Sequence, residues 1–125
     1  MASEQVSVPT EGSEGRRALR LLPGRGEYST SGGCSQHMLT NNTDRALAIK
    51  IKLTDTSLYR IRPVFAFIPP HEAIGVEVSR EPGPPKKDTL IVDFVTAESP
   101  RQPPQDAFRT ADNIERARFP LQATD

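Results

Sequence analysis

Residues 46–68 read ALAIKIKLTDTSLYRIRPVFAFI, and this stretch decides the fold class of the chain. Its first run alternates apolar side chains with Lys50 and Lys52, a spacing of two that predicts a half-buried β-strand. A helix would spread the two lysines around its circumference, whereas a strand places both on one face. A second run, residues 58–62, alternates in the same way and stops at Pro63, which lacks the N–H group that a sheet needs. The stretch therefore predicts two short strands that meet at a proline.

Similar runs elsewhere in the chain predict several more short strands. They are expected at residues 18–22, 35–40, 65–68, 73–80, 89–96 and 117–121. Turn and loop signals separate them, namely Asn and Asp at 41–44, prolines at 81–87, and a polar loop at 98–113 with one helical turn near residues 105–108. About seven short strands separated by turns predict an all-β protein, an antiparallel β-sandwich.

The length of 125 residues suits a single domain. Such a chain buries about two thirds of the surface that it exposes when unfolded, so its core needs neither a disulfide nor a metal to be stable. We divide the chain into a polar N-terminal extension, residues 1–16, which we expect to be flexible, and one domain that spans residues 17–122.

Composition narrows the class of protein further. The single cysteine, Cys34, excludes an intrachain disulfide and is typical of a reducing compartment. The N-terminus lacks the apolar core of a secretory signal, and no run approaches the ~20 apolar residues of a membrane span. Sixteen basic and 16 acidic residues balance, which argues against a nucleic-acid binder because counterion release needs clustered cations. We expect a cytoplasmic protein that neither binds nucleic acid nor inserts into membranes.

Several longer segments together resemble a known family. They are GGCSQHML, NNTDRALAIKIKLTDTSLYRIRPVFAFIPP, VEVSREPGPPKKDTLIVDF and the closing FPL, in this order within residues 17–122. In content and spacing they are similar to the major sperm protein domain, an immunoglobulin-like, seven-stranded antiparallel β-sandwich. The PQDAF segment and the late FPL are more similar to the small sperm-specific members found in nematodes than to the membrane-tethered members.

The resemblance implies a non-enzymatic protein of the actin-free filament cytoskeleton in crawling nematode sperm. In this interpretation the chain is a structural or accessory component that binds major sperm protein filaments, or other proteins with this domain, in the cytoplasm of the sperm pseudopod. Whether it also forms a homodimer stays open. The resemblance carries an alternative as well, a cytosolic adaptor domain that recognises acidic linear peptide motifs.

Few residues are available for chemistry. Catalysis and metal binding need converging ligands, and the only histidines and cysteine are His37, His71 and Cys34. Cys34 and His37 lie three positions apart and could form a nucleophile pair, but no carboxylate stands beside them to orient the imidazole. The pattern favours a half-buried thiol beside a surface imidazole at a strand end. We predict no catalytic residue, no metal and no cofactor.

The stronger candidate site is cationic. Lys50 and Lys52 share one face of the first strand, and Arg60 and Arg62 share one face of the second. If the two strands are neighbours in a sheet, the four side chains form one patch that suits an acidic peptide or the acidic surface of a partner. The other interpretation is an ordinary solvated strand face. We take these four residues as the candidate partner-binding site.

The resemblance adds two points about individual residues. Family members that bind acidic motifs carry two strand lysines, then a threonine, and a Lys and a Met on a later strand. The lysines match here, whereas Leu53, Thr89 and Ile91 stand at the other positions, which favours the cytoskeletal role over the adaptor. The family also places a proline in a bend, so Pro63 is expected to have a structural role. A cis peptide before it is compatible with the low cost of cis X-Pro bonds, about 0.5 to 1 kcal/mol.

Overall fold

The computed structural model describes residues 18–98 and 101–125. Nine strands and one short helix follow one another within these residues. The strands are β1 Leu19–Leu22, β2 Gly26–Ser29, β3 Gly33–Asn41, β4 Leu47–Leu53, β5 Tyr59–Arg62, β6 Phe65–Ile68, β7 Ala73–Arg80, β8 Lys86–Thr96 and β9 Glu115–Thr124. The helix, α2, spans Pro104–Arg109 between the last two strands. The predicted N-terminal extension, residues 1–16, lies outside the described residues.

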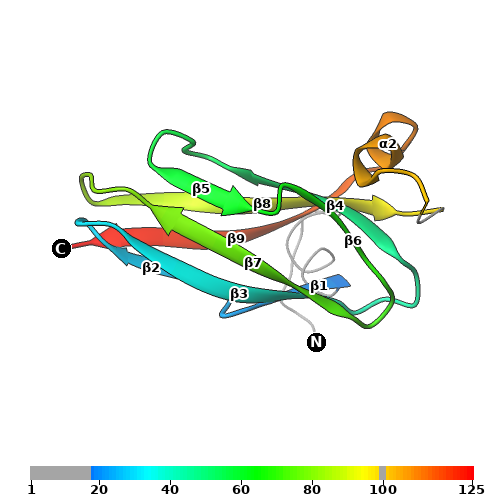
Figure 1. Ribbon diagram of the computed structural model, residues 1–125, viewed down its shortest axis with the longest axis horizontal. Coiled ribbons are helices and arrows are strands. Elements are labelled where there is room, and N and C mark those ends of the chain that lie inside the picture. The colour runs from blue at the N-terminus through cyan, green and yellow to red at the C-terminus, as the bar shows by residue number, and fades with distance from the viewer. Residues whose placement is uncertain (1–17, 99–100) are drawn as a thin grey trace.

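Two sheets pack face to face to form the body of the molecule (Figure 1). The four-stranded sheet has the order β1-β3-β7-β5, and the five-stranded sheet has the order β2-β9-β8-β4-β6. Among the described strands every neighbouring pair is antiparallel except β2 and β9, which run parallel. The prediction of an all-β sandwich is confirmed, with nine strands where about seven were expected.

The core lies between the two sheets and follows from the alternation in the sequence. On β4 the side chains of Ile49 and Ile51 are buried, while Lys50 and Lys52 point to the opposite face. The inward faces of the other strands contribute apolar side chains as well. Among the largest fully buried ones are Tyr59, Leu19, Leu39, Ile49, Ile51, Ile68, Leu90, Leu121, Val76, Val78 and Val92. Each such burial contributes about 1.5 to 3 kcal/mol, so the core decides which face of every strand turns outward.

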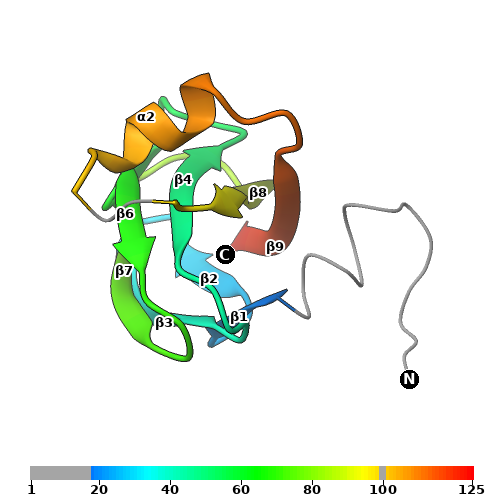
Figure 2. The same ribbon diagram turned by 90° about the vertical axis from the view of Figure 1, so that its right-hand side faces the viewer.

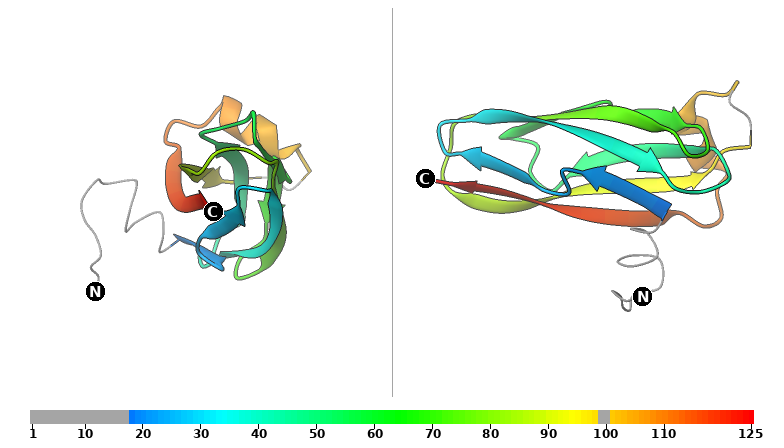
Figure 3. Two further views of the ribbon diagram at one scale, coloured as in Figure 1. Left: turned by 90° about the vertical axis from the view of Figure 1, so that its left-hand side faces the viewer. Right: turned by 90° about the horizontal axis from the view of Figure 1, so that it is seen from below.

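Two of the connections that cross between the sheets contain a proline that follows a cis peptide. β1 belongs to the four-stranded sheet and β2 to the five-stranded sheet, and the Leu22–Pro23 peptide between them is cis (Figure 3). β5 and β6 are divided between the sheets in the same way, around the cis Arg62–Pro63 peptide. Pro63 therefore stands where the chain leaves one sheet for the other.

Several strand boundaries differ from the prediction. β8 begins at Lys86, inside the segment 81–87 that the sequence assigned to a loop, because its first two residues pair with the end of β9. β9 runs on to Thr124, and β2 was not predicted at all, since GEYS carries no clear alternation of apolar residues. Pairing with a neighbouring strand decides these boundaries, and a local pattern does not show it.

Helix α2 covers one end of the five-stranded sheet from outside (Figure 2). It lies against β4 and β6, and its Phe108 packs edge to face on Phe65 with ring centroids 6.3 Å apart. Because of this cover, Ala48 and Val95 are buried although alternation turns their side chains outward. The helical turn predicted near residues 105–108 is confirmed.

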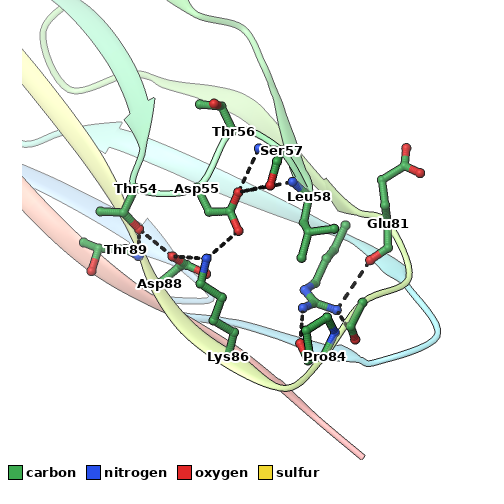
Figure 4. A network of polar contacts seen from close by, with 12 residues as sticks. Thr54, Asp55, Thr56, Ser57, Leu58, Glu81, Pro84, Lys86, Asp88 and Thr89 are labelled. Carbon is green, nitrogen blue, oxygen red and sulfur yellow. Dashed lines mark hydrogen bonds and ion pairs between the residues drawn. The ribbon is translucent and has the colours of Figure 1, made fainter.

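A polar network ties the loops together at the opposite end of the sandwich (Figure 4). Asp55, which is buried, accepts hydrogen bonds from the backbone N–H and the hydroxyl of Ser57. Its other oxygen lies 2.6 Å from Lys86 Nζ at the start of β8. Beside it, Thr54 donates to Asp88 Oδ1 at 2.8 Å. These contacts attach the loop after β4 to β8.

Arg80, at the end of β7, is a buried cation that orders the proline-rich loop. Its guanidinium lies over the ring of Tyr59, 5.6 Å from the centroid. Its N–H groups donate to the backbone carbonyl groups of Glu81, Gly83 and Pro84. Prolines leave this loop with few backbone donors of its own, so the arginine supplies the hydrogen bonds that define its path.

Candidate partner-binding surface

The four predicted binding residues lie on two different sheets. Lys50 and Lys52 belong to β4 in the five-stranded sheet, whereas Arg60 and Arg62 belong to β5 at the edge of the four-stranded sheet. β4 pairs with β6 and β8, and β5 pairs with β7, so the two strands are not neighbours. The single patch that the sequence predicts for neighbouring strands is therefore not formed.

Lys50 and Lys52 instead share their face with residues of β8 and β9. We call this face the cationic plate, which consists of two rows of three residues across β4, β8 and β9. The first row holds Lys50, Asp93 and Arg116, and the second holds Lys52, Ile91 and Arg118. Each row carries a cation at either end, so four positive charges surround one carboxylate and one apolar side chain.

Sequence reasoning missed the two arginines of the cationic plate, although a signal for them was present. In β9, Arg116 and Arg118 alternate with the buried Ala117 and Phe119, so both arginines point outward. What the sequence lacks is the pairing of β9 with β8, which brings them beside the lysines of β4.

Asp93 is the electrostatic centre of the cationic plate. Only 8% of its side chain is exposed, because Lys52 and Arg116 lie across it. Arg116 Nε lies 2.6 Å from Oδ1 and Nη2 lies 3.2 Å from Oδ2, while Lys52 Nζ lies 2.8 Å from Oδ2. Burial acts to raise the pKa of Asp93, but the hydrogen bonds from Arg116 and Lys52 outweigh it and bring that pKa below its ordinary value.

An aromatic rim borders the cationic plate on the side of β6. Lys50 Nζ lies 5.6 Å from the centroid of the Phe65 ring, which is a cation–π contact. Phe65 in turn packs on Phe108 of α2. The rim therefore positions the Lys50 ammonium through an aromatic face and adds apolar surface next to the charges.

Arg60 and Arg62 face outward from the other sheet and make local contacts. Arg62 Nη2 pairs with Glu77 Oε1 on β7, and Arg60 Nη1 lies 2.9 Å from the carbonyl oxygen of Thr56. The pairing with Glu77 leaves one net positive charge among these three ionised side chains. This group is smaller than the cationic plate and lies on the opposite side of the sandwich.

The exposures of Cys34 and His37 are the reverse of the prediction. Cys34 is exposed, and its Sγ donates a hydrogen bond to Glu77 Oε2 at 3.3 Å. His37 is buried, with Nδ1 2.7 Å from the carbonyl oxygen of Pro23 and Nε2 2.7 Å from Ser35 Oγ. The thiol and the imidazole point to opposite faces of β3, so they do not form a nucleophile pair.

The remaining candidate for chemistry, His71, lies apart from both. It is exposed, adopts a left-handed backbone conformation with φ of 61°, and its Nε2 lies 2.7 Å from Asp44 Oδ1. Within residues 18–98 and 101–125, no three His, Cys, Asp or Glu side chains come together as a metal-binding group. Over that same part of the chain, no helix is long and apolar enough to cross a membrane.

Comparison with known proteins decides the family. The family model of the MSP (Major sperm protein) domain matches residues 25–116. The chain belongs to the major sperm protein domain family. Among curated relatives, sperm-specific class P protein 34 of Caenorhabditis elegans is 32% identical over 91 residues, which cover 73% of this chain and 85% of that protein. Class P protein 16 of the same organism is 36% identical over 94 residues, or 75% and 86% of the two chains. The resemblance seen in the sequence is confirmed.

Solved structures of MSP-domain proteins share this fold. WR4, a C. elegans MSP family member, has a TM-score of 0.76 at 28% identity and covers 86% of this chain and 98% of its own. SSP-19, a C. elegans protein with an MSP-like domain, has the same TM-score at 31% identity and covers 84% and 98%. The periplasmic chaperone SfaE has a TM-score of 0.64 at 14% identity over 84% of this chain and 56% of its own, which shows the fold alone. The immunoglobulin-like class expected for an MSP domain is confirmed.

Proposed function

We propose that this chain is a non-enzymatic structural or accessory protein of the nematode sperm cytoskeleton that binds MSP filaments or their subunits. Membership of the MSP domain family is the observation that carries the proposal. The curated relatives named above support it, because they are sperm-specific proteins. The family builds structures rather than catalysing reactions, which favours a role in binding over an enzymatic one. We place the protein in the cytoplasm of the sperm pseudopod.

The cationic plate is the surface that we assign to this contact. Its six residues include four cations and one carboxylate, and they lie on one outward face of the five-stranded sheet. A face of this kind attracts an acidic surface over a distance and orients it on approach. The partner is an MSP filament, another MSP-domain protein or a second copy of this chain.

Co-sedimentation with MSP filaments tests the proposal. We expect the purified protein to pellet with the filaments and the Lys50→Glu, Lys52→Glu variant to stay in the supernatant. The matched control is Arg60→Glu, Arg62→Glu, which reverses the same number of charges on the opposite sheet and is expected to pellet like the wild type. Wild-type protein that does not pellet contradicts the proposal, and pelleting of all three forms moves the contact away from the plate.

A second candidate function is a cytosolic adaptor for acidic linear motifs. One observation favours it, namely that the cationic plate combines its charges with the apolar Ile91 and the aromatic rim at Phe65. Peptides often bind such faces in an extended form, with side chains placed alternately on charged and apolar contacts. Saturable binding of an acidic peptide without any binding to filaments, lost in the Lys50→Glu, Lys52→Glu variant, would favour the adaptor.

A further inference from the structure

A carboxylate already occupies the place on the cationic plate where an acidic partner would bind. Asp93 lies between Lys50 and Arg116 in the register of the sheet, and its two oxygens receive N–H groups from Arg116 and Lys52 at 2.6 to 3.2 Å. These are the contacts that a carboxylate of a bound partner makes with Lys and Arg. The plate therefore already contains a carboxylate of its own, the same group that it is suited to bind on a partner.

The geometry points to Asp93 as a built-in competitor that sets how acidic a partner must be to bind the cationic plate. This inference rests on the proposed binding function of the plate. Asp93 cannot move aside, because its strand β8 is paired on both sides and its short side chain is held by two cations. A partner must share Lys52 and Arg116 with it. The sharing is chemically feasible because an ammonium has three N–H donors and a guanidinium has five.

The positions of the residues in the cationic plate indicate what kind of partner fits it. Strands in a sheet lie about 4.8 Å apart, so the Cα atoms at the two ends of a row are about 10 Å apart. The long side chains of Lys52 and Arg116 reach inward from these positions to Asp93. The two rows are separated by two residues along each strand, or about 7 Å. An extended acidic segment presents every second side chain at that same interval, so carboxylates at alternate positions can reach one cation in each row. A segment with Glu at every second residue fits this pattern, and an isolated carboxylate reaches one cation only.

Asp93 also explains how these cations can lie close together. Lys52 and Arg116 both approach one carboxylate, and without it their like charges would repel across the same short distance. Removal of the carboxylate therefore has two effects, a cost to folding and a stronger positive field outside. A purely structural role predicts the first effect alone, so a binding measurement separates the two interpretations.

The test uses the full chain and a fluorescein-labelled peptide, (Glu-Thr)4, whose binding is followed by fluorescence anisotropy. We expect Asp93→Asn to bind the peptide about tenfold more tightly than the wild type, because the carboxylate that competes with the peptide for Lys52 and Arg116 is gone. Glu77→Gln is the matched control. It neutralises a carboxylate that pairs with Arg62 on the opposite sheet, changes the net charge by the same amount, and is expected to leave peptide affinity unchanged.

A second variant keeps the inference testable if Asp93→Asn does not fold. Ile91→Asp places an additional carboxylate between Lys52 and Arg118, at a partly exposed position, and is expected to weaken peptide binding about tenfold. Folded Asp93→Asn that binds the peptide no more tightly than the wild type overturns the inference. So does Ile91→Asp that binds as tightly as the wild type, or an absence of binding by every folded form.

The peptide assay needs no filaments, so it separates the two proposals. If the wild type does not bind filaments but Asp93→Asn still binds the peptide more tightly, the proposed function is contradicted and the role of Asp93 remains supported. Intact filament binding with no effect of Asp93→Asn removes the inference and leaves the proposed function.

Discussion

Lys86 Nζ lies 2.6 Å from Asp55 Oδ2, which ties the first residue of β8 to the loop that follows β4. Hydrogen bonds from Lys86 and then from Ser57 hold the pKa of Asp55 well below its usual range. A carboxylate with a lowered native pKa stabilises the fold above its unfolded pKa of about 3.9. That stabilisation is lost as the pH falls through the lower native pKa.

Asp55→Asn is therefore expected to lower the thermal unfolding midpoint at pH 7. It is also expected to remove part of the loss of stability that the wild type shows below about pH 4. Thermal melts across this range measure both effects. The control is Asp106→Asn on α2, whose partly exposed carboxylate pairs with the exposed Arg109 at 3.4 Å and contributes little. Equal pH profiles for the wild type and Asp55→Asn would show that the contact with Lys86 adds nothing.

The alternation of β4 predicts that truncating two adjacent residues changes stability by very different amounts. Ile49 is fully buried and Lys50 points outward, so Ile49→Ala is expected to lower the free energy of unfolding by about 2 to 5 kcal/mol. Lys50→Ala is expected to lower it by about 0.5 to 1 kcal/mol only, because it removes the cation–π contact with Phe65. Urea unfolding of both variants measures the difference. Similar losses of unfolding free energy for the two variants would mean that β4 does not bury one face only.

His37 is expected to be needed for stability rather than for chemistry. His37→Leu removes the hydrogen bonds to the Pro23 carbonyl and to the Ser35 hydroxyl, which keeps Tyr28 as a partner, so a cost of about 0.5 to 1.5 kcal/mol is expected for each bond lost. Cys34→Ala on the outer face of the same strand is expected to be neutral within about 0.5 kcal/mol. Chemical unfolding separates the two. A neutral His37→Leu variant would show that the buried hydrogen bonds are replaced by others.

The thiol of Cys34 is expected to react slowly despite its exposure. The hydrogen bond to Glu77 is the main cause that raises the pKa of Cys34, and it lowers the fraction of thiolate at neutral pH. Alkylation by iodoacetamide at pH 8, followed by mass spectrometry, is expected to be slower than for a free thiol. Glu77→Gln is expected to accelerate it, and an unchanged rate in that variant would contradict the explanation.

The two arginines found only in the structure should matter as much as the two lysines predicted from sequence. Arg116→Glu, Arg118→Glu is expected to abolish co-sedimentation with MSP filaments to the same degree as Lys50→Glu, Lys52→Glu, because all four cations share the plate. Binding of the wild type is expected to weaken as salt rises from about 0.05 to 0.5 M, since exposed charges are screened. Binding that survives the arginine reversal at low salt would confine the contact to the lysines or move it elsewhere.

Much of the fold could be predicted because the sequence pattern that indicates each strand is local. β7 reads AIGVEVSR and buries Val76 and Val78 as its alternation indicates, and α2 appears where one helical turn was expected. β2 and the first residues of β8 were missed because pairing with β9 defines them. The exposures of Cys34 and His37 were reversed for a related reason: a strand with polar residues on both faces does not show which face the core will take.

For the candidate site, too, local patterns predicted some features and strand pairing decided the others. Alternation places Lys50 and Lys52 on one outward face of β4, and the same alternation in β9 places Arg116 and Arg118 on one outward face. The order of strands in the sheet then decided which cations meet. β8 brings the lysines and these arginines together around Asp93. The chain crosses to the other sheet over residues 54–58, so Arg60 and Arg62 lie in that sheet.

The amino-acid sequence by itself determined the class of the protein, its family, and the side of each well-patterned strand that faces the core. It could do so because side chains alternate along any strand and apolar ones are driven out of water, and both effects act within a few residues. Only the tertiary structure decided which strands are neighbours, and therefore that the candidate binding surface has a carboxylate at its centre. Strand order depends on hydrogen bonds and buried area shared by segments far apart in the chain, so no short pattern contains it.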